Sequence, residues 1–412
     1  MNRTMADRNI NKLNKLTAGM FLVVLMLCLV GLVAVYSASS NVDQGFFQRA
    51  IGRQVIWMAL GLIIASIIFM VKRELLFDIS YWIYGGGLVL IMLPYISPLS
   101  AGTHRWISIG GFNYQPSEIM KIILALTLAK YFTTTKISKS DFKVLIFPLI
   151  LTLIPTVIVL NQPDLGTAII YLLSLFPIMF WAKVDFVNIF ILIAPVVSIL
   201  SAFNFYTFFI WLIIIVSVLY LKKIKLWHFI LIIIINLSLG SVSPLLWNKL
   251  EPYQQKRILT LFDVNSDPQG AGYQVIQSQV AIGSGGFSGK GLGQGKQTHL
   301  KFLPEQKTDF IFSVIGEEWG FIGVAFVLLL YFLMVYLSIK SAYRSNNQYS
   351  TLVIIGLTGV LFFHVVINIA MTVGLMPVTG LPLPFLSYGG SFLTSCFIIV
   401  GLIFNMNRKT EI

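Results

Sequence analysis

The sequence NSDPQGAGYQVIQSQVAIGSGGFSGKGLGQG (265–295), followed closely by LPEQKTDFIFSVIGEEWG (303–320), lies in the one long polar interval of an otherwise almost continuously apolar chain. Of the 412 residues, 57% are hydrophobic and 11% are charged, and the mean hydropathy is +0.85. These values exclude an ordinary soluble protein. We therefore expect the chemistry of this protein to lie in the interval 247–320.

Long apolar runs without two-residue alternation flank this interval on both sides. A bilayer core is roughly 30 Å thick, so a helical span needs about 20 apolar residues, and lipid tolerates only helices or closed barrels. The sequence therefore predicts an all-α polytopic membrane protein in one domain, 1–412. Twelve spans are expected at 16–37, 54–71, 78–97, 117–133, 144–160, 165–182, 186–203, 206–221, 228–247, 310–338, 352–374 and 386–405.

Basic residues decide which way the spans run. With a cytoplasmic N-terminus, 18 of the 29 Lys and Arg residues fall in cytoplasmic segments, in agreement with the positive-inside rule. Membrane topology thus accounts for most of the formal charge of +13, and no nucleic acid partner is implied. Both termini are predicted to be cytoplasmic, and 248–308 is predicted to be a large extracytoplasmic loop. Its seven basic residues suit an anionic ligand such as pyrophosphate, or form an ordinary solvated surface.

Two features leave alternatives open. The spans 186–203 and 206–221 are joined by the very short NFYT, so they could also form a single long or re-entrant element. The basic leader and first apolar run could be a cleaved signal peptide, although the run is long enough to remain as a span. The two cysteines, Cys28 and Cys396, lie in apolar runs and indicate neither a disulfide framework nor a metal site.

A polar loop precedes the span at 117–133. Pro116 is suited to a helix start, Glu118 in the first turn complements the helix dipole, and Lys121 lies three residues further on the same face. We expect Glu118 and Lys121 to pair, either as a functional site or as a lock between helices. Arg105 and Trp106 are candidates for an interfacial pair, or for an ordinary aromatic anchor.

Three other features of the sequence have structural interpretations. Asp164, in NQPDLGTA, is expected to cap the following helix. His364 and Asn368 are four residues apart on one helical face, and hydrogen bonding between helices is favoured over metal binding there. The sequence GLMPVTGLPLPFLSYGGS (374–391) predicts an irregular re-entrant segment buried against the bundle.

The polar interval contains further candidates. Asp267 lies on a turn rich in proline and glycine, where backbone can approach a ligand closely. Lys290 lies among glycines, but no G-x-x-x-x-G-K-[ST] pattern occurs, so a nucleotide P-loop is rejected and a flexible loop is the alternative. Thr308 is expected to cap a helix with Asp309 in its first turn. Glu317 and Glu318 would follow about 12 Å along that helix, facing protein, water or a cation.

These motifs together resemble a known family. QPDLGTA, DPQGAGYQ, QSQVAIGSGG with GKG, FLPEQKTDFIF, GEEWGFIG and NIAMTVGLMPVTGLPLPFLSYGGS are similar to the SEDS proteins (shape, elongation, division and sporulation) over roughly 16–406, with closer resemblance to the RodA branch than to FtsW. The family usually has ten spans, so this chain departs from it by two, and 186–225 is predicted to be an inserted helix pair.

The resemblance implies a peptidoglycan glycosyltransferase that polymerises lipid II into glycan strands at the outer face of the bacterial cytoplasmic membrane, for cell elongation and shape. It implies that Asp267 is the catalytic aspartate, a base for inverting transfer. The other candidate substrate-binding or cavity residues are Arg105, Trp106, Glu118, Lys121, Lys290, Asp309, Glu317 and Glu318. No cofactor is certain, although a divalent cation such as Mg²⁺ or Mn²⁺ remains an option.

The resemblance also implies partners. These are lipid II and the growing glycan strand, a class B penicillin-binding protein that cross-links the strands, and other membrane proteins of the elongation complex. Two other functions remain open: a lipid II flippase, because charged groups inside the bundle could form a transport path, and a non-catalytic scaffold for cell-wall synthesis.

Overall fold

A computed structural model describes residues 2–39, 50–97, 104–109, 112–135, 143–260, 270–300, 302–303 and 305–408. Within these ranges a long helix covers most of each of the twelve predicted spans. They are α1 (Asn2–Ser37), α2 (Ala50–Met70), α3 (Arg73–Met92), α4 (Pro116–Thr134), α5 (Lys143–Leu160), α6 (Leu165–Trp181), α7 (Phe186–Ser201), α8 (Phe205–Leu221), α9 (Leu226–Lys249), α13 (Ile311–Arg344), α14 (Gln348–Thr372) and α15 (Gly390–Asn407). Seven of them contain segments long and apolar enough to cross a membrane, and α5 to α8 provide four shorter apolar helices. The prediction of a polytopic helical membrane protein is confirmed.

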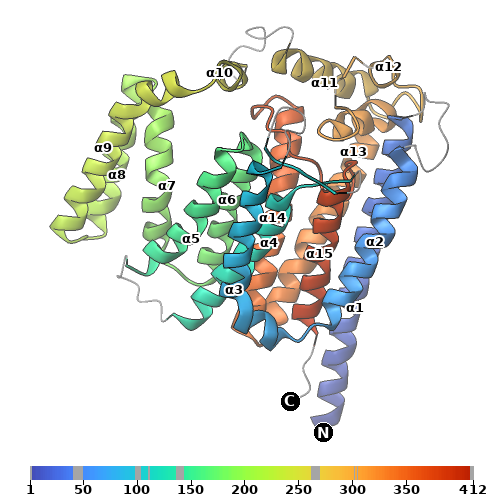
Figure 1. The fold of residues 1–412 in the computed structure, drawn as a ribbon, viewed down its shortest axis with the longest axis horizontal. Coiled ribbons are helices and arrows are strands. Elements are labelled where there is room, and N and C mark those ends of the chain that lie inside the picture. The colour runs from blue at the N-terminus through green and yellow to red at the C-terminus, as the bar shows by residue number, and fades with distance from the viewer. Residues whose placement is uncertain are drawn as a thin grey trace.

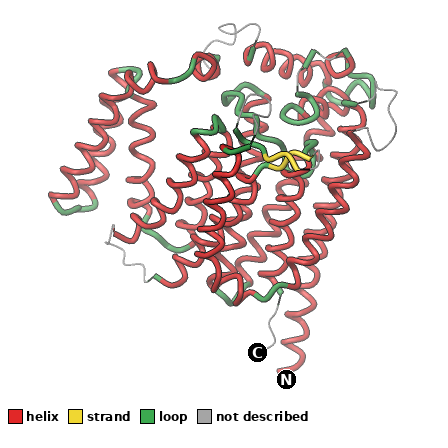
Figure 2. The backbone as a smooth tube through the Cα atoms, viewed as in Figure 1, coloured by secondary structure: helices red, strands yellow, loops and turns green. Residues whose placement is uncertain are grey.

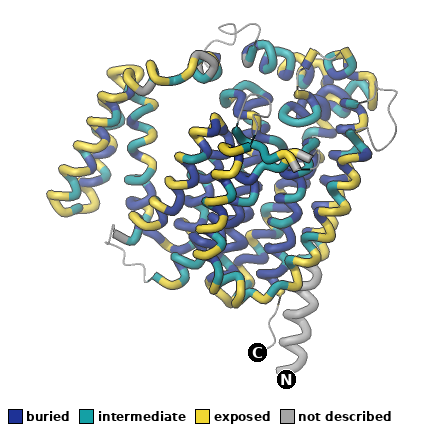
Figure 3. Tube along the Cα trace, viewed as in Figure 1, coloured by how far each residue is buried: buried dark blue, intermediate teal, exposed yellow. Residues whose placement is uncertain are grey.

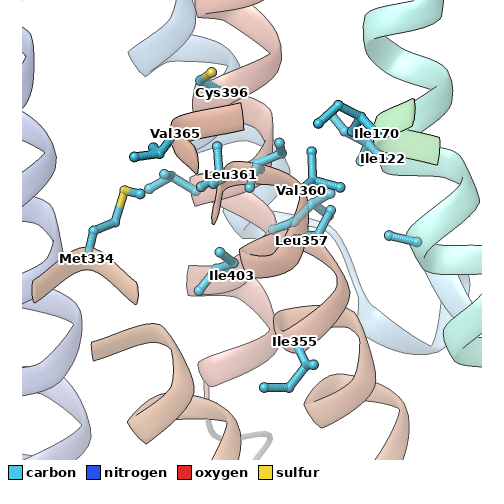
Figure 4. Packing of buried hydrophobic residues seen from close by; sticks show 14 of the residues in the cluster. Ile122, Ile170, Met334, Ile355, Leu357, Val360, Leu361, Val365, Cys396 and Ile403 are labelled. Carbon is cyan, nitrogen blue, oxygen red and sulfur yellow. The ribbon is translucent and has the colours of Figure 1, made fainter. Parts of the chain in front are cut away.

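The centre of the bundle is α14, whose apolar residues pack on three sides. Figure 4 shows Leu357 and Val360 of α14 between Ile122 of α4, Ile170 of α6 and Ile403 of α15. The helices differ in how far they are buried: Figure 3 shows α14 and α15 mostly buried and α2 widely exposed. Exposed apolar helices suit contact with lipid, and α14 is placed to carry polar groups away from it.

Helices α7, α8 and α9 form a separate group beside the main bundle (Figure 1). They share a small core of their own that includes Ala194 and Ile215. Inside it, Ser198 Oγ donates a hydrogen bond to Asn236 Oδ1 at 2.7 Å, and Trp211 Nε1 donates to Ser198 Oγ at 3.0 Å. Hydrogen bonds of this kind hold helices together where water is absent.

Short elements gather at the end of the bundle opposite both termini (Figure 1). They are α10 (Pro252–Leu259), α11 (Ala271–Gly285) and α12 (Lys296–His299), and we call this region the α10–α12 end. A two-stranded antiparallel hairpin of β1 (Ile107–Ile109) and β2 (Phe112–Tyr114), which the sequence did not predict, follows α3 and precedes α4 in the sequence. Figure 2 shows it in yellow, toward the end of the bundle that lies opposite both termini. One further element, the 3₁₀ helix η1 (Leu93–Tyr95), ends α3.

The segment 373–389 between α14 and α15 contains no helix, as its prolines and glycines predict. Its apolar side chains are nevertheless buried, with Leu383 and Leu386 at 0% exposure. Tyr331 of α13 donates a hydrogen bond to the Pro384 carbonyl at 2.6 Å, which satisfies one of the free backbone groups. The prediction of an irregular buried segment is confirmed, and we call 373–389 the re-entrant segment.

Candidate functional site

A charged cluster is buried between α4, α14 and α15. Lys121 Nζ lies 2.7 Å from Glu118 Oε2 and 2.8 Å from His364 Nε2, and Ser395 Oγ donates to Glu118 Oε2 at 3.2 Å. Because the lysine ammonium can only donate, His364 Nε2 accepts and the ring hydrogen is on Nδ1. The predicted Glu118–Lys121 pair is confirmed, and so is hydrogen bonding between helices at His364.

This cluster is closed to solvent. Glu118 is 3% exposed and Lys121 is 2% exposed, so neither side chain faces an open surface in this structure. A buried charge pair of this kind is stable only when both partners and their hydrogen bonds are in place. The arrangement therefore locks three helices together, and Ser395, which no sequence pattern marked, completes it.

The β-hairpin places Arg105 against the turn between α5 and α6. Its Nε donates to the Gln162 carbonyl at 3.0 Å, and its Nη2 donates to the Pro163 carbonyl. Arg105 and the adjacent Trp106 are both half-buried. The guanidinium is thus held in place by neutral carbonyls, which leaves its positive charge without a carboxylate partner among the described residues.

The same turn is held in place by hydrogen bonds to the Asp164 side chain. Its Oδ1 accepts from the Thr167 backbone N–H at 3.2 Å, which confirms the predicted cap of α6. Its other oxygen accepts from Gln115 Nε2 at 2.8 Å, just before α4 begins. Asp164 therefore connects the start of α4 to the start of α6 by hydrogen bonds, next to the turn that holds Arg105.

Helix α13 is broken at Gly320, where φ is 62° and ψ is −158°. A break leaves backbone carbonyls before it and N–H groups after it without helical partners. The glycine-rich loop that follows α11 supplies those partners. The hydrogen bonds are Lys290 N to Glu317 O (3.1 Å), Gly291 N to Glu318 O (3.0 Å), Phe321 N to Gly286 O (2.9 Å) and Ile322 N to Phe287 O (3.2 Å).

This loop requires glycine at the point of closest approach. Gly289 has a φ of 80°, and a Cβ there would lie 2.1 Å from the Glu318 carbonyl oxygen. Its partner Gly320 would place a Cβ 2.3 Å from the Gly289 nitrogen. The glycines at 286–291 therefore allow two backbones to pair closely, a role that the sequence did not predict for this loop.

Glu317 secures the loop through its side chain. Its carboxylate, at 0% exposure, accepts hydrogen bonds from Lys290 Nζ (2.8 Å), Gln297 N (3.0 Å), Thr298 N (3.1 Å) and Thr298 Oγ1 (2.9 Å). Glu318 accepts from Ser37 at the end of α1 and lies 3.9 Å from His299 Nε2. Of the three environments expected for these carboxylates, protein, water or a cation, the structure shows protein groups around both, and both lie beside the helix break at the α10–α12 end. Thr298 and Ser37 carried no signal in the sequence.

The start of α13 differs from the prediction. The helix begins at Ile311 with Phe310 at its cap position, so Thr308 does not cap it and Asp309 is not in its first turn. Thr308 Oγ1 instead donates to the Glu305 carbonyl at 3.2 Å. The residues 305–310 form a turn that packs on the re-entrant segment, because Asn368 of α14 donates to both the Asp309 and Leu381 carbonyls, at 2.8 and 2.7 Å.

Asp309 is the candidate carboxylate with the most altered acidity outside the spans. The side chain is half-buried, and burial, reinforced by the charge of Glu305, raises its pKa to about 6. Thr308, Arg257 and Arg105 act in the opposite direction. A carboxyl group with such a pKa is a typical feature of functional sites.

Two candidates remain without a structural test. Asp267 lies in 261–269, outside the described residues, so its proposed role stays a prediction. Among the described residues no three His, Cys, Asp or Glu side chains group as metal ligands would, so no divalent cation site is located there.

Comparisons with known proteins agree with the motifs. The model of the FtsW, RodA and SpoVE family, described as "Cell cycle protein", matches residues 18–207 and 186–412. The chain is 32% identical to "Peptidoglycan glycosyltransferase RodA" of Treponema pallidum, covering 95% of this chain and 97% of that protein. It is 33% identical to "Peptidoglycan glycosyltransferase MrdB" of Escherichia coli K12, covering 95% and 93%.

Solved structures show the same relationship. One, with 29% identity and a TM-score of 0.71, covers 94% of this chain and 96% of the other, and is described as "Structural coordination of polymerization and crosslinking by a peptidoglycan synthase complex". The Thermus thermophilus rod shape determining protein RodA is 26% identical with a TM-score of 0.61, and covers 94% and 95%.

Proposed function

Because the chain belongs to the FtsW, RodA and SpoVE family of cell cycle proteins, we propose that it is a peptidoglycan glycosyltransferase that polymerises lipid II for cell elongation and shape. One observation carries the proposal: 95% of the chain aligns with each of two proteins of that named activity, at 32% and 33% identity. The locked polar groups at the α10–α12 end support it, since a rigid scaffold is what a transfer site requires.

The proposed reaction is an inverting transfer. The 4-hydroxyl of the acceptor sugar attacks the anomeric carbon of the donor sugar, and a new C–O bond forms. The bond between that carbon and the pyrophosphate breaks, and its electron pair leaves with the pyrophosphate. Asp267 takes the hydroxyl proton as general base. The reaction needs no other carboxylate to act as a nucleophile, because the configuration at the anomeric carbon inverts in a single displacement.

A cation must stabilise the departing pyrophosphate. Of the candidates, Lys121 is buried against Glu118, and Lys290 is bound to Glu317. Arg105 is held by two neutral carbonyls and is half-exposed, so we assign the role to Arg105. A Mg²⁺ or Mn²⁺ ion is the alternative, and loss of polymer with EDTA, restored by either ion, would support it.

The site, the α10–α12 end and the loop 248–308 are proposed to face outward from the bacterial cytoplasmic membrane, with both termini in the cytoplasm. A class B penicillin-binding protein is the proposed partner, in keeping with the complex of polymerisation and cross-linking to which the fold is similar. A reporter fused after Lys225 tests the topology. Cytoplasmic signal there is expected, and a periplasmic signal contradicts the twelve-span count.

Purified protein supplied with lipid II tests the activity. Wild type and the matched control Asp263→Asn should form glycan polymer, and Asp267→Asn should lose about 100-fold or more of the rate, as expected for removal of a general base. Full polymer yield from Asp267→Asn would contradict the assignment of the base. Transfer of lipid II across liposomes by wild type without polymer would favour a flippase, and neither activity would favour a scaffold.

A further inference from the structure

The turn that carries Asp309 is fixed by three successive backbone carbonyls. The Tyr388 backbone N–H donates to Lys307 O at 2.8 Å, Ser387 Oγ donates to Thr308 O at 2.5 Å, and Asn368 Nδ2 donates to Asp309 O at 2.8 Å. The donors come from the re-entrant segment and from α14. A backbone held at three consecutive residues leaves the attached side chain little freedom, which is the usual support of a binding group.

The Asp309 carboxylate, by contrast, has few partners. Among the described residues, the Thr308 hydroxyl is the one side-chain donor near this carboxylate, and it is shared, because it also lies 3.2 Å from the Glu305 carbonyl oxygen and 3.1 Å from Glu305 Oε2. Gly380, with a φ of 72°, lies beside it and leaves space, because even a Cβ there would be 3.5 Å from Asp309 Oδ2. The side chain is half-buried, so a ligand can reach the unused lone pairs.

The charges around Asp309 come from three parts of the chain. Glu305 on its own turn disfavours the ionised carboxylate, whereas Arg105 near the hairpin and Arg257 of α10 favour it. The re-entrant segment contributes no ionisable side chain except Tyr388, and the neighbouring residue of α14 is the neutral Asn368. Charges of both signs therefore surround the carboxylate, and Glu305 has the largest effect of the three, so a neutral hydroxyl donor can bind without adding a further charge.

Ionised Asp309 is unfavourable for the fold. Since its pKa in the folded protein lies above that of an unfolded aspartate, the folded state binds more protons, and stability falls as pH rises from about 4 to about 6. A neutral side chain of the same shape would be more stable here above pH 6. Groups that lower stability in this way are a known mark of functional sites.

We infer that the Asp309 carboxylate binds the glycan acceptor, accepting a hydrogen bond from a sugar hydroxyl beside Arg105. This rests on the proposed glycosyltransferase function and adds a substrate-binding group to it. A hydroxyl donor satisfies the free lone pairs without introducing charge, whereas the pyrophosphate of the donor lipid would be repelled by the carboxylate and drawn to the arginine.

The test compares Asp309→Asn with the wild type in lipid II polymerisation and in thermal unfolding, both as a function of pH. In the wild type, kcat/KM should rise with pH through an acid limb near pH 6, because the carboxylate must be ionised to accept the stronger hydrogen bond. Asp309→Asn should lose about 10- to 100-fold of kcat/KM above pH 7, lack that limb, and have a higher Tm at pH 7 to 8.

Glu305→Gln is the matched control. It removes the neighbouring negative charge on an exposed side chain, so the acid limb should move to lower pH while activity at pH 7 is kept. An Asp309→Asn protein with wild-type activity and an unchanged acid limb would overturn the inference, and so would one that loses both activity and Tm. A wild type that forms no polymer would instead contradict the proposed function and remove the basis of this inference with it.

Discussion

Lys121 Nζ on α4 and His364 Nε2 on α14 lie 2.8 Å apart, and the same ammonium pairs with Glu118. The imidazole is therefore a second hydrogen-bond acceptor, beside the Glu118 carboxylate, for a buried lysine ammonium. Each member of this set depends on the other two, because a desolvated ammonium needs both its counter-charge and its hydrogen bonds.

Substitutions at His364 should distinguish the contribution of its hydrogen bond with Lys121 from the contribution of its packing in the core. His364→Leu fills the space but removes the acceptor, and should lower the free energy of unfolding by about 1–3 kcal/mol. His364→Gln offers a side-chain oxygen and should lose less. Lys121→Met leaves Glu118 buried and unpaired, and should cost about 3–5 kcal/mol. Denaturant unfolding in detergent measures all three, and equal stability of the Leu and Gln variants would refute the role of the acceptor.

Substitution at the closest approach of loop and helix should be severe. Gly289→Ala places a Cβ against the Glu318 carbonyl oxygen in a residue with a positive φ. Backbone strain and the steric clash each cost about 1–3 kcal/mol, so the variant should lose at least about 2 kcal/mol of stability. Gly283→Ala, in α11 with nothing within 4 Å of its Cβ position, is the matched control and should be neutral or slightly stabilising. Comparable losses in both would show that the loop is not paired with α13 in this way.

The Glu317 carboxylate should depend on Lys290 only in part. Lys290→Met removes one of four donors, from a side chain that is 26% exposed, and should cost about 1 kcal/mol. Glu317→Leu leaves the Thr298 and Gln297 N–H groups buried without an acceptor and should cost about 3–5 kcal/mol. A double-mutant cycle measures the coupling, and a value near zero would contradict the ion pair.

The hydrogen bonds inside α7, α8 and α9 should hold that group together. Asn236→Leu leaves the Ser198 hydroxyl without its acceptor and should reduce stability by about 0.5–2 kcal/mol. Ser217→Ala, which removes an exposed hydroxyl bonded only within α8, is the control and should change little. Protease sensitivity of the α8–α9 turn gives a local readout, and equal sensitivity in both variants would argue against the predicted role.

Local patterns predicted the features that depend on neighbouring residues. Apolar length located the helices, the three-residue spacing of Glu118 and Lys121 predicted their pairing, and the position of Asp164 predicted the α6 cap. The break at Gly320 escaped prediction, because its compensation comes from a loop about 30 residues earlier. Ser37 and Glu318 are 281 residues apart, so no sequence window could join them. The β-hairpin has strands of only three residues, too short for a periodic signal.

The pair α7 and α8 begins and ends at one place. Asp185, which caps α7, lies 3.8 Å from Lys222, which follows α8. A hairpin whose two ends meet can be gained or lost as a cassette without reversing any helix after it. The number of crossings in such a chain can therefore change by two while α9 to α15, and every group at the α10–α12 end, stay on the same side of the membrane.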